Sequence, residues 1–333
     1  MSNASPVVFG FDFQFHAAIY IMLKHIEDAV SVRVEGENED VEISLINEYG
    51  IFSQAKSFTN PNDGKNAISK LSKALQSLDS ASKYPKTSKT IYVTNSSNPF
   101  NNNSLTNYFI DVKSYRFEDL PEYCRGKISE IINKLKLNNL DLTSFEVWTL
   151  PFIGDEPNRY ATVKRLISEF LINIKQSDGM ATKLLDTWQN RFSHNASKQD
   201  TSIKITKEEM MWSLIVIAID LNPESAEVEG FDPSLAKLLS NRFSDFINSK
   251  GHRFDFATRV ITSYEDYCQT HNISSTNSAF QNFILEEWCL FRDEFSGVFD
   301  DLETEKTLIM LIVRKILGER LMIREIKRKV NIL

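Results

Sequence analysis

The pattern of apolar and polar residues divides the chain into a first half with strands and helices and a second half with helical patterns only. A dense apolar segment at about 12–28 predicts a buried helix. Strict two-residue alternation then predicts three strands, at 30–34, 40–46 and 51–56. The elements that follow alternate in type: a helix at 64–78, a strand at 89–95, a helix at 128–135, a strand at 145–150 and a helix at 161–174. This order indicates an α/β domain, with a mixed sheet flanked by helices.

The second half carries apolar residues at helical spacing and no strand pattern. We expect an all-α C-terminal domain with helices at 206–221, 233–246, 256–268, 280–291 and 305–329. A polar stretch at 193–202 marks the connection between the halves. The predicted organisation is a first domain at 8–176, a linker region at 177–206, and a helical sensing or assembly domain at 207–333.

Charge and cysteine content narrow the functional classes. The 333 residues include 38 Lys and Arg against 45 Asp and Glu, giving a net charge of −7. This balance argues against a surface that coats nucleic acid everywhere, but it permits a local basic groove. The three cysteines form no CxxC pair, so neither a disulfide framework nor a zinc site is expected. No uninterrupted apolar run reaches about 18 residues, and we expect a cytoplasmic protein that does not bind a membrane.

The second and third predicted strands carry polar residues at alternate positions. If residues 48–50 form a three-residue hairpin loop with glycine in the left-handed region, Glu42 lies opposite Lys56. Because side chains alternate between faces, Asp40, Glu42, Gln54 and Lys56 then share one face of the hairpin. A four-residue loop would place the two polar sets on opposite faces.

A carboxylate, an amide and a lysine on one face suit metal-dependent phosphodiester hydrolysis. Carboxylate oxygens bind Mg²⁺, which polarises a phosphate and supplies hydroxide near neutral pH. A lysine ammonium can orient the water or neutralise the growing charge on phosphorus. The alternative is that Asp40 and Lys56 form a solvated cross-strand ion pair, which contributes less than ~1 kcal/mol.

At these positions the chain resembles the PD-(D/E)xK nucleases. Asp40 followed by Gln54-Ala55-Lys56 matches their D…(E/Q)xK signature in its Gln-x-Lys form. Three further short motifs resemble the double-stranded DNA endonuclease domain of bacterial anti-phage effectors of the CBASS and Lamassu types. They are Gly10-Phe11-Asp12-Phe13-Gln14, Val34-Glu35 and Tyr92-Val93-Thr94-Asn95. The resemblance covers roughly residues 8–175 and implies a restriction-endonuclease-like fold.

The resemblance also implies the roles of individual residues. Asp40 and Gln54 are expected to bind Mg²⁺ or Mn²⁺, and Lys56 is expected to be the catalytic lysine. Glutamine replaces the more usual acid at position 54, which removes one negative charge from the site. Glu35, which matches an acidic position before the Asp, or Glu42 would compensate for that loss.

Two of the supporting assignments have alternatives. Gln14 matches a polar position on the first helix of related enzymes, but it can equally form a bond within a helix layer. The position of Glu42 is more typical of a surface residue of its strand than of a ligand.

The function implied by the resemblance is metal-dependent cleavage of double-stranded DNA by an effector of anti-phage defence. Such a nuclease is held inactive until partner subunits, such as an SMC-like ATPase and an accessory protein, or homo-oligomerisation activate it. One alternative is a catalytically inactive nuclease fold that binds DNA or assembles a complex. Another is an effector activated directly by a cyclic oligonucleotide.

The end of the chain combines apolar and basic residues. Residues 314–329 include seven basic residues against two acidic ones. An amphipathic helix of this kind can dock a partner or contact a DNA backbone. The alternative is a helix that packs on its own domain and leaves its charges in solvent.

Overall fold

The computed structural model describes residues 5–62, 64–218, 254–274, 277–295 and 301–332. The chain forms two compact units. The first comprises residues 1–173 and 177–207, and the second comprises residues 174–176 and 208–333.

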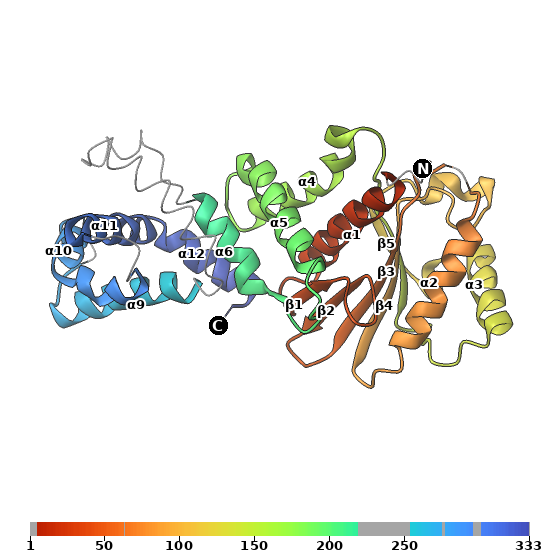
Figure 1. Ribbon diagram of the computed structural model, residues 1–333, viewed down its shortest axis with the longest axis horizontal. Coiled ribbons are helices and arrows are strands. Elements are labelled where there is room, and N and C mark those ends of the chain that lie inside the picture. The colour runs from red at the N-terminus through yellow and green to blue at the C-terminus, as the bar shows by residue number, and fades with distance from the viewer. Residues whose placement is uncertain (1–4, 63, 219–253, 275–276, 296–300, 333) are drawn as a thin grey trace. The chain divides into compact units, whose positions relative to one another are not determined.

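A seven-stranded mixed sheet forms the centre of the first unit, in the order β5-β6-β4-β3-β2-β1-β7 (Figure 1). Its strands are β1 (Ala29–Val34), β2 (Val41–Leu45), β3 (Gly50–Lys56), β4 (Thr87–Thr94), β5 (Lys113–Arg116), β6 (Phe145–Thr149) and β7 (Ile205–Thr206). The central strands β3, β4 and β6 are parallel, and the other neighbours pair antiparallel. The mixed α/β sheet that the alternating elements predicted is confirmed.

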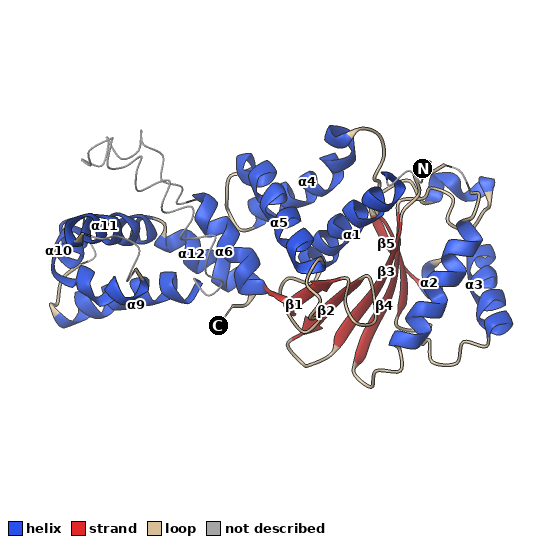
Figure 2. Ribbon diagram, viewed as in Figure 1, coloured by secondary structure: helices blue, strands red, loops and turns tan. Residues whose placement is uncertain are grey.

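Helices cover both faces of this sheet (Figure 2). On one face lie α1 (Ser5–Lys24), α4 (Glu156–Asn173) and α5 (Ala181–Ala196). On the other lie α2 (Ala67–Ala81) and α3 (Glu122–Leu135). Short 3₁₀ turns connect some of these elements: η1 (Asn103–Tyr108), η2 (Phe117–Asp119) and η3 (Asp178–Met180).

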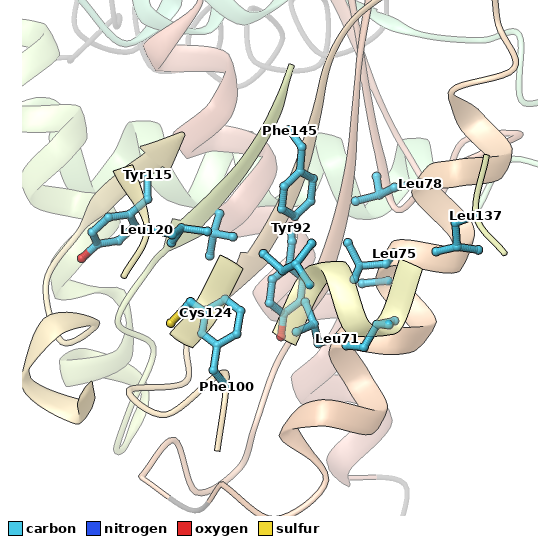
Figure 3. Packing of buried hydrophobic residues seen from close by; sticks show 14 of the residues in the cluster. Leu71, Leu75, Leu78, Tyr92, Phe100, Tyr115, Leu120, Cys124, Leu137 and Phe145 are labelled. Atoms are coloured by element: carbon cyan, nitrogen blue, oxygen red, sulfur yellow. The ribbon is translucent and has the colours of Figure 1, made fainter. Parts of the chain in front are cut away.

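The apolar core beneath α2 and α3 shows why these segments are helical (Figure 3). Leu71, Leu75 and Leu78 are spaced at i, i+4 and i+7, so they lie on one side of α2, and all three are fully buried. They pack with Tyr92 and Phe145 from the sheet. Phe52 belongs to the same cluster, so the face of β3 that carries Phe52 points towards α2.

Helix α1 is the one described helix long and apolar enough to cross a membrane, by length and composition alone. The sequence alone did not indicate a possible membrane span here, because the apolar residues of α1 do not form one uninterrupted run. Eight of its residues are buried in the first unit, including His16 and Tyr20. These buried residues place α1 in the core of the first unit.

The segment predicted to be a linker, 177–206, instead folds as part of the first unit. It forms η3, α5 and β7, and Trp188 of α5 is fully buried. Strand β7 is only two residues long, and β5 is mostly polar and exposed, so neither gives an alternating apolar pattern. Both strands were absent from the prediction for this reason.

The described part of the second unit contains helices only. They are α6 (Lys207–Ala218), whose first residue belongs to the first unit, α9 (Phe254–Thr270), α10 (Asn277–Glu287), η4 (Trp288–Glu294), α11 (Leu302–Gly318) and α12 (Arg320–Val330). The helix predicted at 233–246 lies outside the described residues. The single helix predicted at 305–329 is two helices, divided at Glu319.

The apolar residues of this C-terminal segment are buried in their own unit. Leu308, Ile312 and Ile316 of α11 are at most 2% exposed. On α12, Arg328 pairs with Glu325 of the same helix at 2.7 Å. The apolar positions therefore fit the alternative of a helix packed on its own domain.

Candidate active site

The predicted polar residues meet at one end of the sheet, where β3 ends and β2 begins. Gln54 and Lys56 lie at the carboxyl end of β3, and Asp40 directly precedes β2. The two strands pair Val41 with Ser53, and continuing this register places Asp40 beside Gln54. Side chains of alternate residues point to the same face, so Asp40, Gln54 and Lys56 share the face that carries α2.

The register of the hairpin differs from the predicted one. Glu42 lies opposite Phe52 and not opposite Lys56. The left-handed residue in the loop is Glu48, with φ of 66°, whereas Gly50 belongs to β3. The register moved by an even number of residues, so the prediction of a shared face still holds.

Hydrogen bonds around Asp40 unite the three residues of the signature. Its Oδ1 accepts a bond from the Gln54 Nε2 at 3.1 Å. Its Oδ2 accepts bonds from the Ala55 backbone N–H at 2.9 Å and from the Lys56 Nζ at 3.1 Å. The Asp40 side chain is 15% exposed and that of Lys56 is 27% exposed, so solvent reaches both.

Glu42 shapes the turn that leads to Asp40. Its Oε1 accepts hydrogen bonds from the backbone N–H groups of Asn38 at 2.7 Å and Glu39 at 3.2 Å. A Cβ on Gly36 would lie 2.4 Å from the Glu42 carboxylate carbon, so a larger residue there would displace this carboxylate. These bonds give Glu42 a structural role in the turn, and its compensation for the missing acid stays a prediction.

Glu35 and Gln14 reach the same end of the sheet from β1 and α1. Burial, and next the charge of Asp40, raise the pKa of the Glu35 carboxyl, while contact with the Gln14 side chain opposes this rise. The Gln14 Oε1 is buried without a hydrogen-bond partner among the described residues. The structure thus brings both supporting residues to the site.

Two further charged residues at this site are outside the signature. Glu39 is 3% exposed, and burial raises its pKa to about 8. Lys70 of α2 donates a hydrogen bond to the Ser57 carbonyl, and burial, followed by the charge of Lys56, lowers its pKa. Neither residue carries a sequence signal, because a turn and a separate helix bring them to the site.

The end of β3 is fixed by the residues that close β4. The Thr94 hydroxyl donates to the Lys56 carbonyl at 3.0 Å. The Asn95 side chain bonds both the N–H of Phe58, at 2.7 Å, and its carbonyl, at 2.9 Å. Asn95 also donates to the Phe152 carbonyl at 3.0 Å, which ties the chain after β3 to the chain after β6. These bonds hold the backbone that presents Lys56.

The donors at this site are those that a hard cation prefers. They are carboxylate oxygens and amide oxygens, and the Glu39 and Gln14 oxygens are buried without hydrogen-bond partners in the part of the chain that the structure describes. Among the described residues, no group of three or more His, Cys, Asp or Glu side chains is already arranged so that it could hold a metal ion. By donor chemistry the residues fit Mg²⁺ or Mn²⁺, with Asp40 as the central carboxylate.

A second polar cluster lies between α1, α4 and α5, beside a cavity of about 860 Å³. Asp12 accepts a hydrogen bond from the Tyr160 hydroxyl at 3.0 Å and pairs with Arg159 at 3.4 Å. His16 stacks on Tyr160 with ring centroids 4.5 Å apart. These bonds join helices α1 and α4, and Asp40 and Lys56 are not among the residues that line the cavity.

The fold and site define a mixed α/β protein with a carboxylate, an amide and a lysine bonded together at one end of its sheet. No family model matches the chain, and no curated protein matches it. One similar solved structure is the Acinetobacter baumannii Cap4 SAVED/CARF-domain containing receptor with the cyclic trinucleotide 2'3'3'-cAAA. It is 14% identical with a TM-score of 0.39, over 66% of this chain and 46% of that chain.

A second similar structure is the Moraxella osloensis Cap4 SAVED/CARF-domain containing receptor. It is 17% identical with a TM-score of 0.40, and the match covers 62% of this chain and 47% of that chain. The chain spans less than half the length of either structure. At this level of similarity the functional inference rests on the site itself.

Proposed function

We propose that the protein is a Mg²⁺-dependent endonuclease for double-stranded DNA, with a restriction-endonuclease-like first unit, that acts as an effector of bacterial anti-phage defence. One observation carries the proposal: Asp40, Gln54 and Lys56, which resemble the nuclease signature, are bonded together at an accessible end of the sheet. An isolated surface ion pair between Asp40 and Lys56 would not need the further hydrogen bonds that Asp40 accepts from Gln54 and from the Ala55 N–H.

The residues divide the work of phosphodiester hydrolysis between them. Asp40 and Gln54 would hold the cation, which when bound polarises the scissile phosphate and favours hydroxide near neutral pH. The Lys56 ammonium then orients the attacking water or stabilises the charge that develops on the phosphate oxygens. Lys70 adds a second positive charge beside Lys56, which favours the approach of a phosphate.

Activity requires control, because unrestrained cleavage would destroy the host chromosome. The net charge of −7 gives the chain little long-range attraction to DNA, so assembly is an effective means of activation. The activator is either a set of partner subunits, such as an SMC-like ATPase and an accessory protein, or a cyclic oligonucleotide. Either one would gather several nuclease units on one duplex.

The test is cleavage of a supercoiled plasmid by the purified full chain in Mg²⁺, alone, with cyclic trinucleotides and with the products of neighbouring genes. We expect cleavage that EDTA abolishes and that Asp40→Asn lacks. Glu48→Gln is the matched control, because Glu48 is an exposed carboxylate at the tip of the same hairpin. Equal cleavage by Asp40→Asn and the parent would reject the assignment. DNA binding without cleavage under every activator would favour the inactive scaffold.

A further inference from the structure

Glu39 is a buried carboxyl group without a hydrogen-bond partner among the described residues. Its residue is 3% exposed, and neither carboxylate oxygen accepts a hydrogen bond from the described residues. The Gln54 and Ser77 side chains lie beside it but form no hydrogen bond of ordinary geometry with it. A buried carboxyl in such a place is stable only if it holds a proton or meets a cation.

The local charges favour a cation. The Asp40 carboxyl interacts electrostatically with those of Glu35 and Glu39, and the cationic groups nearby are those of Lys56, Lys70 and Arg33. Lys56 is bonded to Asp40, and Lys70 is bonded to a backbone carbonyl. Arg33 donates to backbone carbonyls, so none of these three cations is bonded to Glu39 in the described residues.

We propose that Glu39 is a ligand of the divalent cation that Asp40 binds, and that it supplies the negative charge missing from position 54. This inference rests on the proposed function and adds a residue to its site. Glu39 precedes Asp40 in the chain, and its carboxyl lies beside Gln54, the residue whose acid is absent. Glu42 is less suited to this role, because two backbone N–H groups hold its Oε1 in the turn.

Glu39→Gln separates a metal ligand from a protonated carboxyl that only fills space. The amide is similar in size and neutral, so it reproduces the protonated carboxyl but not the carboxylate. The matched control is Glu37→Gln, two residues away in the same turn, where the side chain is exposed. Glu39→Met removes the carboxylate, keeps a similar side-chain length and serves as the second variant if the amide prevents folding.

The measurement is calorimetric titration of Mn²⁺ into the full chain, accompanied by thermal unfolding with and without Mn²⁺. We expect Glu39→Gln to weaken Mn²⁺ binding by about tenfold or more, since charge count sets affinity at such sites. Its unfolding temperature without metal should equal or exceed that of the parent, because an unpaired buried carboxyl is removed. Glu37→Gln should match the parent in both measurements.

Two results distinguish failure of this inference from failure of the proposed function. If Asp40→Asn loses Mn²⁺ binding while Glu39→Gln binds as the parent does, Glu39 is a buried acid only and the inference is overturned. If the parent binds no Mn²⁺, or Asp40→Asn binds it unchanged, the proposed metal site itself is wrong. Where Glu39→Gln does not fold, loss of Mn²⁺ binding by a folded Glu39→Met supports the carboxylate as ligand, and parental Mn²⁺ binding by Glu39→Met overturns the inference.

Discussion

Replacing Lys56 by methionine should separate catalysis from stability. The substitution keeps most of the side-chain length and removes the ammonium group. The Lys56 side chain is 27% exposed and forms an ion pair with Asp40 at 3.1 Å. After the change, Asp40 retains its bonds from the Gln54 amide and the Ala55 N–H. No buried charge is therefore left without a hydrogen bond.

The magnitudes follow from this geometry. A partly exposed ion pair contributes about 1 kcal/mol or less to the free energy of unfolding. For a unit of this size that corresponds to a fall in unfolding temperature of roughly 2–4 °C. Loss of a group that stabilises transition-state charge lowers a rate by roughly 10²–10³-fold. Lys56→Met should therefore remain folded and lose nearly all cleavage.

The assay combines single-turnover plasmid cleavage in Mg²⁺, with whichever activator the parent requires, and thermal unfolding of the same preparations. Lys86→Met is the control, because Lys86 forms an exposed ion pair with Glu48 in the same unit. Lys86→Met should keep parental cleavage and stability. The reasoning is refuted if Lys56→Met cleaves at the parental rate, or if it loses more than about 4 kcal/mol of stability and so proves to be mainly structural.

Two further predictions concern the frame of the first unit. Arg33 is fully buried and donates hydrogen bonds to the carbonyls of Asn195, Lys198 and Ile203. Arg33→Met should therefore lower the free energy of unfolding, measured in urea, by roughly 3 kcal/mol. A change below about 1 kcal/mol would show that these bonds do not stabilise the first unit. Burial, and next the charge of Lys89, lower the pKa of His25 from its ordinary 6.5, so the unfolded chain binds the proton more tightly and stability should fall as the pH drops below 6.5. His25→Phe should flatten this dependence between pH 7 and pH 5 in urea titrations, and equal slopes for the two proteins would show that His25 is not responsible.

The sequence was sufficient to place Asp40, Gln54 and Lys56 on one face, because strand alternation fixes the face of each side chain. It was not sufficient for the register, which depends on the loop residue that adopts a positive φ. That residue is Glu48 and not the expected glycine. The sequence did not indicate the structural role of Glu42, because its hydrogen-bond partners are backbone amides of the turn before β2 and not strand residues.

Contacts between distant segments account for the other omissions. The apolar residues of α5 were present in the sequence, but the polar stretch at 193–202 led to the prediction of a linker where the first unit in fact continues. The main chain of that stretch is held by Arg33, through the Asn195 and Lys198 carbonyls. Lys70 joins the site only because α2 packs on β3, a contact that local patterns do not encode.

The most direct test of the metal-dependent site is the position of bound metal in crystals of the full chain soaked with Mn²⁺. Anomalous scattering locates Mn²⁺ without reference to activity. The proposed function predicts a peak within coordination distance, about 2.2 Å, of an Asp40 carboxylate oxygen, and no peak there in Asp40→Asn. Absence of a peak beside Asp40, at a Mn²⁺ concentration at which the same protein cleaves plasmid, would contradict the central claim.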